Sequence, residues 1–328
     1  MRQMISTALC AVGNVSPELN NITQAVNDLN AFSHSHIDEY DFERMLPILN
    51  QLGTSSGNKG SWIDLCHGDP RLLFPLLYSS LHMLHSSDAV VGRASNKALK
   101  TLITTCAEQL SSKRREQIDL SRNAWMQFIE KTILPCLKIG LTTKADDTRR
   151  HFILLISHVA RHFSSYESPH LYGDLNALIR DDDQDLDFFL NVTHLQLHRR
   201  VKALQRLRKM VYTNDADPPF SQQSFGNILL PLALHPIYEC SSKAEDTFAV
   251  EAIATVGAIT SHVPWGKYNE TLQSVLNSLT RRRDNERHLI ALLCVIIDSF
   301  HFKVEAEAIG SEGKSQAKNE GNGVSRID

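Results

Sequence analysis

The chain has 328 residues, of which 42% are apolar and 22% charged, and its 34 Lys and Arg residues against 37 Asp and Glu residues give a formal net charge of −3. A chain of this length buries about three quarters of its unfolded surface, so the apolar content is sufficient for a full core and excludes disorder along the whole chain. The charge balance excludes a protein that coats nucleic acid over its entire surface, because phosphate contacts require an excess of Lys and Arg. Any such contact must be a local patch.

Apolar positions recur at helical spacing along most of the chain, and the alternation typical of strands is scarce. We therefore predict an all-α chain whose helices are joined by short polar segments. In chain order the predicted helix pairs are 17–32 with 39–52, 70–85 with 88–109, 121–141 with 146–163, 222–239 with 244–262, and 267–281 with 284–302.

Two features recur in these pairs. A proline lies inside an apolar helical segment at Pro47, Pro75, Pro135 and Pro231, where it should kink the helix. An Asp then starts the following helix with an Arg a few residues later, as at Asp88, Asp146 and Asp284. A kinked helix, a short turn and an Asp-capped helix are typical of HEAT repeats. We predict a HEAT-like α-solenoid over residues 1–302, with a non-repeating helical bundle as the alternative.

The last segment, 303–328, differs in composition from the rest of the chain. It is rich in Glu, Gly, Ser, Lys and Asn and contains no aromatic residue. Such a segment cannot bury enough apolar surface to fold, so we predict a disordered tail. The polar loop 54–60 is also predicted to be flexible from its composition.

The cysteines and the apolar runs indicate the setting of the protein. Six cysteines lie at least thirty positions apart without a C-x-x-C pair, which is typical of a reducing compartment. No apolar run approaches the roughly 18 residues of a membrane helix, and the first twelve residues do not form a signal peptide. We expect a soluble intracellular protein with no membrane contact.

Two patterns resemble catalytic motifs. Residues 53–57 read GTSSG, but a nucleophile elbow needs a strand before the serine and a helix directly after it, whereas here a helix precedes and a glycine-rich loop follows. In the acidic loop 180–187, Asp181, Asp182 and Asp185 match the spacing of a magnesium-diphosphate motif, but no second acidic cluster is evident. A solvated acidic linker is the preferred interpretation.

Two histidine pairs have the spacing of zinc ligands on one helix face. These pairs, His158 with His162 and His194 with His198, lack the internal Glu of H-E-x-x-H and a third ligand. We therefore predict no catalytic residue, no metal site and no cofactor. The protein is expected not to be an enzyme and to have no small-molecule substrate.

The most informative segment is the basic amphipathic helix predicted over 194–212, which carries six cations and no acid. Its apolar residues gather on one face, and four cations form a stripe on the other face, hereafter the basic stripe: Arg199, Lys202, Arg206 and Lys209. This spacing suits contact with phosphates, although an ordinary solvated helix face shows the same pattern. Arg200 and Arg208 lie at the flank of the apolar face, where they should buttress neighbouring helices or pair with the acidic loop.

The acidic loop and the basic helix together, DDDQDLDFFLNVTHLQLHRRVKALQRLRK, resemble the signature of the down-regulated-in-metastasis family. Three further stretches are similar to this family, at 29–49, 133–163 and 228–302. Its members are very large HEAT-repeat subunits of the small-subunit processome, the nucleolar particle built around the U3 small nucleolar RNA. Because family members are many times longer than this chain, the resemblance implies an internal fragment.

The resemblance also implies a function. It implies a non-catalytic scaffold in the nucleolus (nucleus) that supports pre-rRNA processing for the small ribosomal subunit and contacts other processome proteins. The basic stripe would provide a local site for pre-rRNA or small nucleolar RNA. The alternative is a generic HEAT-repeat adaptor of the transport or phosphatase-scaffold type, which binds proteins without RNA contact.

Overall fold

The structure, a computed structural model, describes residues 19–32, 41–54, 60–111, 118–166, 168–213, 219–240, 245–281 and 285–302. Every regular element in these ranges is helical. The predicted tail over 303–328 lies outside the described residues, so its disorder stays a prediction. No helix in the described ranges combines the length and the apolar character needed to cross a lipid bilayer.

The helices follow the order of the predicted pairs. They are α2 (Asn20–Leu29), α3 (Phe42–Leu52), α4 (Trp62–Leu65), α5 (Phe74–Met83), α6 (Ala89–Ser111), α7 (Ile118–Phe128), α8 (Leu134–Gly140), α9 (Asp146–His162), α10 (Phe188–Val192), α11 (Leu197–Thr213), α12 (Gln222–Ser224), α13 (Leu230–Tyr238), α14 (Asp246–Thr260), α15 (Trp265–Arg281) and α16 (Glu286–Asp298). The predicted pairs leave out the short helices α4 and α10, whereas α11 corresponds to the basic helix predicted on its own over 194–212.

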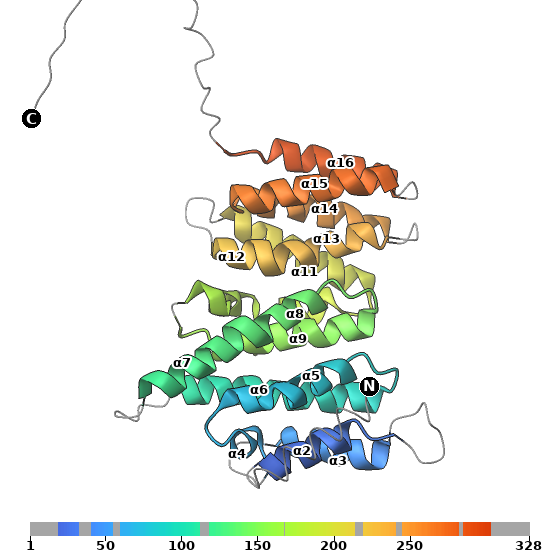
Figure 1. The fold of residues 1–328 in the computed structure, drawn as a ribbon. Helices are drawn as coiled ribbons and strands as arrows, with labels where there is room; N and C mark the ends of the chain where they lie inside the picture. The colour runs from blue at the N-terminus through green and yellow to red at the C-terminus, as the bar shows by residue number, and fades with distance from the viewer. Residues whose placement is uncertain are drawn as a thin grey trace, which may run out of the picture.

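Figure 1 shows these helices stacked in layers along one axis, from α2 and α3 at one end to α15 and α16 at the other. Each layer packs on the next, with α3 against α6, α6 against α9, α11 against α14, and α14 against α16. The all-α solenoid predicted from the sequence is confirmed. It is elongated because each helix pair buries its apolar face mainly against its neighbours in the stack.

The buried apolar residues form one core that runs through the layers. Its largest members include Trp62, Trp125 and Phe163, which are almost fully buried. The indole Nε1 of Trp62 donates a hydrogen bond to the carbonyl oxygen of Ala98 at 2.9 Å, which fixes the short helix α4 against α6. A buried indole needs such an acceptor because an unpaired N–H in the core costs free energy.

The four repeated prolines are accommodated mostly by a change of helix type. Pro47 lies inside α3, whereas Pro75 lies in the first turn of α5, directly after a 3₁₀ turn. Pro135 and Pro231 lie in the first turns of α8 and α13, each directly after a π-helical turn. Proline has no N–H to donate, so the hydrogen-bond register changes at these positions instead of continuing an α-helix through them.

The predicted Asp residues lie at helix starts. The Asp88 carboxylate accepts hydrogen bonds from the backbone N–H groups of Val90 (2.6 Å) and Val91 (3.2 Å) and so caps α6. Asp146 is the first residue of α9, and its carboxylate pairs with Arg149 at 2.9 Å. Asp284 lies outside the described residues.

Candidate nucleic-acid interface

The basic helix α11 packs its apolar face on α10 and α14. Four of its side chains are buried in this contact, Ala203, Leu204, Leu207 and Val211. The opposite face carries the basic stripe, in which Lys202 and Lys209 are exposed and Arg199 and Arg206 are partly buried. The structure therefore places the four cations on the outer face of one helix.

The flanking arginines connect α11 to its neighbours, as the sequence suggested. The guanidinium of Arg208 lies 2.8 Å from the Glu251 carboxylate of α14. Arg200 donates a hydrogen bond to the His194 carbonyl oxygen, and its guanidinium lies 3.9 Å from the Asp146 carboxylate of α9. These two cations serve the packing of α11 between two helices of the solenoid.

The acidic loop is held in place by one of its own carboxylates. Asp187 is only 3% exposed, and its carboxylate caps α10 by accepting from the N–H of Leu190 at 2.8 Å and from the N–H of Arg180 at 3.2 Å. The Asn191 side chain donates to the carbonyl oxygens of Gln184 (2.7 Å) and Asp187 (2.6 Å). The fifth aspartate of the run is thus a structural cap, while Asp181, Asp182, Asp183 and Asp185 are exposed.

The exposed part of the acidic loop lies against the basic stripe. The Asp185 carboxylate lies 2.9 Å from the Arg199 guanidinium, and the Asp185 carbonyl oxygen accepts a hydrogen bond from Arg206. Asp181 pairs with Arg161 of α9. Lys202 and Lys209 form no ion pair with any residue that the structure describes. The basic stripe therefore consists of two cations engaged by the acidic loop and two cations that face solvent.

A groove of about 420 Å³ lies beside α11, between this helix and residues 177–188. Its cationic edge consists of Arg180, Arg206 and Lys209. Its remaining lining is mostly apolar: Ala177, Leu178, Leu186, Phe188, Ala203, Leu207 and Met210. The sequence analysis missed this groove because its walls come from segments that lie about twenty to thirty positions apart.

An exposed aromatic ring lies beside the cations at the end of α11. Tyr212 is 57% exposed and, with Arg208 and Lys209, lines a second, open depression. Residues three apart on a helix lie on the same side of it, and Tyr212 and Lys209 both line this depression. An aromatic ring beside a free cation is an arrangement on which a nucleotide base can stack while its phosphate is neutralised.

The other candidates from the sequence that the structure describes do not assemble into sites. The rings of His158 and His162 lie with centroids 4.3 Å apart at an interplanar angle of 54°, and the Thr104 hydroxyl lies within hydrogen-bond distance of both. Burial, followed by the neighbouring His162 and Lys100, lowers the pKa of His158 to about 3, so this ring is neutral. Ser55, the serine of the GTSSG motif, lies outside the described residues. Asp181 and Asp185 are engaged by different arginines.

Comparison with known proteins identifies the relatives of the chain. Residues 1–145 match the family model described as U3 small nucleolar RNA-associated protein 20, N-terminal. The Saccharomyces cerevisiae protein named U3 small nucleolar RNA-associated protein 20 is 23% identical over 297 residues, which cover 89% of this chain and 11% of the yeast protein. This chain is therefore similar to that protein over most of its own length. The protein of the same name from Schizosaccharomyces pombe is 22% identical over 302 residues, 91% of this chain and 11% of its own length.

The family resemblance seen in the sequence is therefore confirmed. The chain spans about 11% of the length of each of these two relatives. Among solved structures, an engineered protein aligns with 84% of this chain and 97% of its own at a TM-score of 0.31 and 11% identity. A designed armadillo repeat protein aligns with 83% of this chain and 98% of its own at a TM-score of 0.30 and 11% identity. Scores of this size add nothing to the fold described above.

Proposed function

We propose that this chain is a segment of a non-catalytic scaffold that supports pre-rRNA processing for the small ribosomal subunit within the small-subunit processome of the nucleolus. The observation that carries the proposal is the homology to U3 small nucleolar RNA-associated protein 20 over about nine tenths of the chain. An elongated stack of helices suits this role because it offers an extended surface to several neighbours at once.

The proposal includes RNA contact through the basic stripe. Lys202 and Lys209 face solvent, and the exposed Tyr212 lines the same depression as Lys209. Each phosphate contact with a single strand contributes about 0.7 to the slope of log affinity against log salt. Arg199 and Arg206 would exchange Asp185 for a phosphate, which costs little because exposed ion pairs contribute less than about 1 kcal/mol.

The test of the RNA contact reverses the charges that face solvent. We expect the double variant Lys202→Glu with Lys209→Glu, hereafter the basic-stripe variant, to lower the affinity for single-stranded pre-rRNA roughly tenfold. The slope of log affinity against log salt should fall by about 1.4. The matched control, Arg93→Glu with Lys97→Glu, makes the same charge change at two exposed positions of α6. Equal losses of RNA affinity in the two variants would show that the basic stripe is not the RNA contact.

The test of the scaffold role is association with the particle. A tagged copy of the chain should co-sediment with the U3 small nucleolar RNA in a large ribonucleoprotein, and the basic-stripe variant should be recovered there in smaller amount. A chain that is found only in small complexes, with no small nucleolar RNA, would contradict the proposal.

The groove beside α11 favours a second candidate, a protein-binding adaptor without RNA contact. Its apolar lining and its edge of Arg180, Arg206 and Lys209 suit a peptide segment that carries both apolar and acidic side chains. Replacement of the apolar wall by an uncharged polar residue, Leu186→Gln, would abolish such binding and leave RNA affinity unchanged, because it adds no charge beside the basic stripe. The adaptor would be favoured by two results together. The Leu186 variant would lose protein partners but keep its RNA affinity, and the basic-stripe variant would also keep its RNA affinity.

A further inference from the structure

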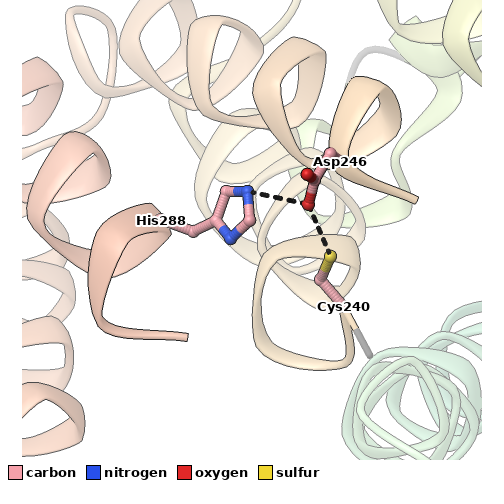
Figure 2. A group of neighbouring side chains, drawn as sticks. All are labelled: Cys240, Asp246 and His288. Atoms are coloured by element: carbon pink, nitrogen blue, oxygen red, sulfur yellow. Dashed lines mark hydrogen bonds and ion pairs between the residues drawn. The ribbon is translucent and has the colours of Figure 1, made fainter. Parts of the chain in front are cut away.

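Three side chains that commonly bind transition metals converge between the last two helix pairs of the solenoid (Figure 2). Cys240 follows the end of α13, Asp246 is the first residue of α14, and His288 lies in the first turn of α16. The sulfur, oxygen and nitrogen atoms that they offer all lie within 4.8 Å of one another. No other group of three potential ligands is this close within the parts of the chain that the structure describes.

The distances are close to those of a metal site. Oδ1 of Asp246 lies 3.5 Å from Nε2 of His288 and 3.9 Å from Sγ of Cys240. Around a tetrahedral Zn²⁺, whose bonds to N, O and S are about 2.1, 2.0 and 2.3 Å long, the corresponding N···O and S···O distances are about 3.3 and 3.5 Å. Two of the three pairs therefore need to move by only a few tenths of an ångström, and the Cys240–His288 pair must close from within 4.8 Å to about 3.6 Å.

The chemistry of the three ligands favours zinc. A thiolate, an imidazole and a carboxylate together suit Zn²⁺, whereas Mg²⁺ and Ca²⁺ prefer oxygen ligands alone. Cys240 is 7% exposed and the His288 side chain 16% exposed, but the Asp246 side chain is 50% exposed. The site is therefore walled on the side of the sulfur and the imidazole and open on the side of the carboxylate, where a water molecule can supply the fourth ligand.

The same residues do not form a catalytic cysteine site. A thiol nucleophile needs a histidine directly beside it, with the carboxylate on the far side of the imidazole. In this cluster the carboxylate of Asp246 lies between the other two groups (Figure 2). A metal ion accounts for the arrangement because all three atoms can bind it at once.

We propose that Cys240, Asp246 and His288 form a zinc site that fastens α16 to the preceding pair, α13 and α14. The three ligands come from three different helix ends, so one ion would join two layers of the solenoid. The same junction is already bridged by Asn285, whose side-chain amide donates to the carbonyl oxygen of Tyr238 at 3.3 Å. Because stacked repeats are stabilised largely by contacts between neighbours, an ion here would stabilise the end of the stack.

The experiment uses the whole 328-residue chain, stripped of metal and titrated anaerobically with Co²⁺. One equivalent should produce a thiolate-to-cobalt charge-transfer band and the intense visible bands of a tetrahedral site, and Zn²⁺ should remove both. Cys240→Ser should abolish the charge-transfer band, and His288→Gln should weaken cobalt binding at least tenfold. The matched control is Cys294→Ser, which removes an exposed thiol from α16, the helix that carries His288, and should keep every band.

Thermal unfolding gives a second readout, and its main measurement, the effect of zinc on the wild-type chain, needs no variant to fold. Excess Zn²⁺ should raise the midpoint temperature of the wild-type chain by several degrees and that of Cys294→Ser equally, but leave the midpoint of His288→Gln unchanged. No thiolate band with one equivalent of Co²⁺, or a band that persists in Cys240→Ser, would overturn the proposal. So would a wild-type midpoint that zinc does not raise, since the cluster would then be an ordinary hydrogen-bonded group.

Discussion

The guanidinium of Arg199 and the carboxylate of Asp185 lie 2.9 Å apart, which joins the acidic loop to the first turn of the basic helix. Both side chains are substantially exposed, at 33% and 68%, so the pair adds little to stability. Its effect is electrostatic: the acidic loop occupies a cation that would otherwise be free for phosphate. The two charge patches that lie apart in the sequence therefore form one surface, and under the RNA contact proposed above the acidic loop would compete with RNA for the basic stripe.

The first prediction follows from this competition. Asp185→Asn should release Arg199 and raise the affinity for single-stranded RNA about two- to fivefold, with a salt slope steeper by about 0.7. Fluorescence anisotropy across a series of KCl concentrations measures both quantities. The control is Asp182→Asn, which removes the same charge from an exposed aspartate of the same loop. If the two variants behave alike, the general charge of the loop matters and the Arg199 contact does not.

The second prediction concerns the buried cap of α10. Asp187→Ala removes the acceptor for the N–H groups of Leu190 and Arg180, so the free energy of unfolding should fall by about 1–2 kcal/mol. Urea unfolding at neutral pH measures this loss. Asp187→Asn keeps one side-chain oxygen and should lose less than Asp187→Ala. Asp182→Ala, at an exposed position of the same loop, should change stability by less than about 0.5 kcal/mol. A similar loss in both alanine variants would contradict the capping role.

The third prediction tests the packing of α8 on α9. A Cβ atom at Gly140 would lie 2.1 Å from Cγ of Phe152, a buried ring that cannot easily move aside. Gly140→Ala should therefore destabilise the chain by about 1–3 kcal/mol through overpacking. Gly266→Ala, in the first turn of α15, meets no atom within 4 Å and should be neutral or slightly stabilising. Thermal unfolding of the two variants side by side decides between these outcomes, and equal midpoints would show that the α8–α9 contact can adjust.

The helix pairs could be predicted from the sequence because burial of a helix face leaves a local period of apolar residues, as in α9 and α14. Helix starts such as Asp88 were also recognisable, since a cap acts within three residues of its own chain. Asp187 was grouped with four solvated aspartates because nothing local distinguishes a buried carboxylate from its exposed neighbours. Cys240, Asp246 and His288 could not be grouped at all, because their approach depends on how α16 packs against α14. The groove beside α11 was also missed, because its walls come from segments that meet only in the folded chain.

The fourth prediction is a pH dependence that originates at His158. Its ring is held between the Thr104 hydroxyl and the His162 ring, with Lys100 and Arg161 as the nearest charges, and no described acid is among its main electrostatic neighbours. Burial, the largest cause, lowers its pKa to about 3 in the folded chain, against an ordinary value of 6.5. At pH values between 3 and 6.5, His158 therefore binds a proton in the unfolded chain but not in the folded chain. Stability is full above pH 6.5 and falls as the pH is lowered toward 3.

This dependence separates wild type from a variant without the ring. Since one pKa unit corresponds to about 1.4 kcal/mol, His158 should cost the wild-type chain about 2 kcal/mol between pH 7 and pH 5. Between the same two pH values, the loss of stability in His158→Gln should be smaller than the loss in wild type by about this amount. Burial also lowers the pKa of His235 to about 4, and this residue contributes equally to both proteins. His170→Gln, at an exposed position, is the control and should follow the wild-type curve. Urea unfolding at the two pH values measures the difference, and parallel losses in His158→Gln and wild type would show that His158 is protonated in the folded chain.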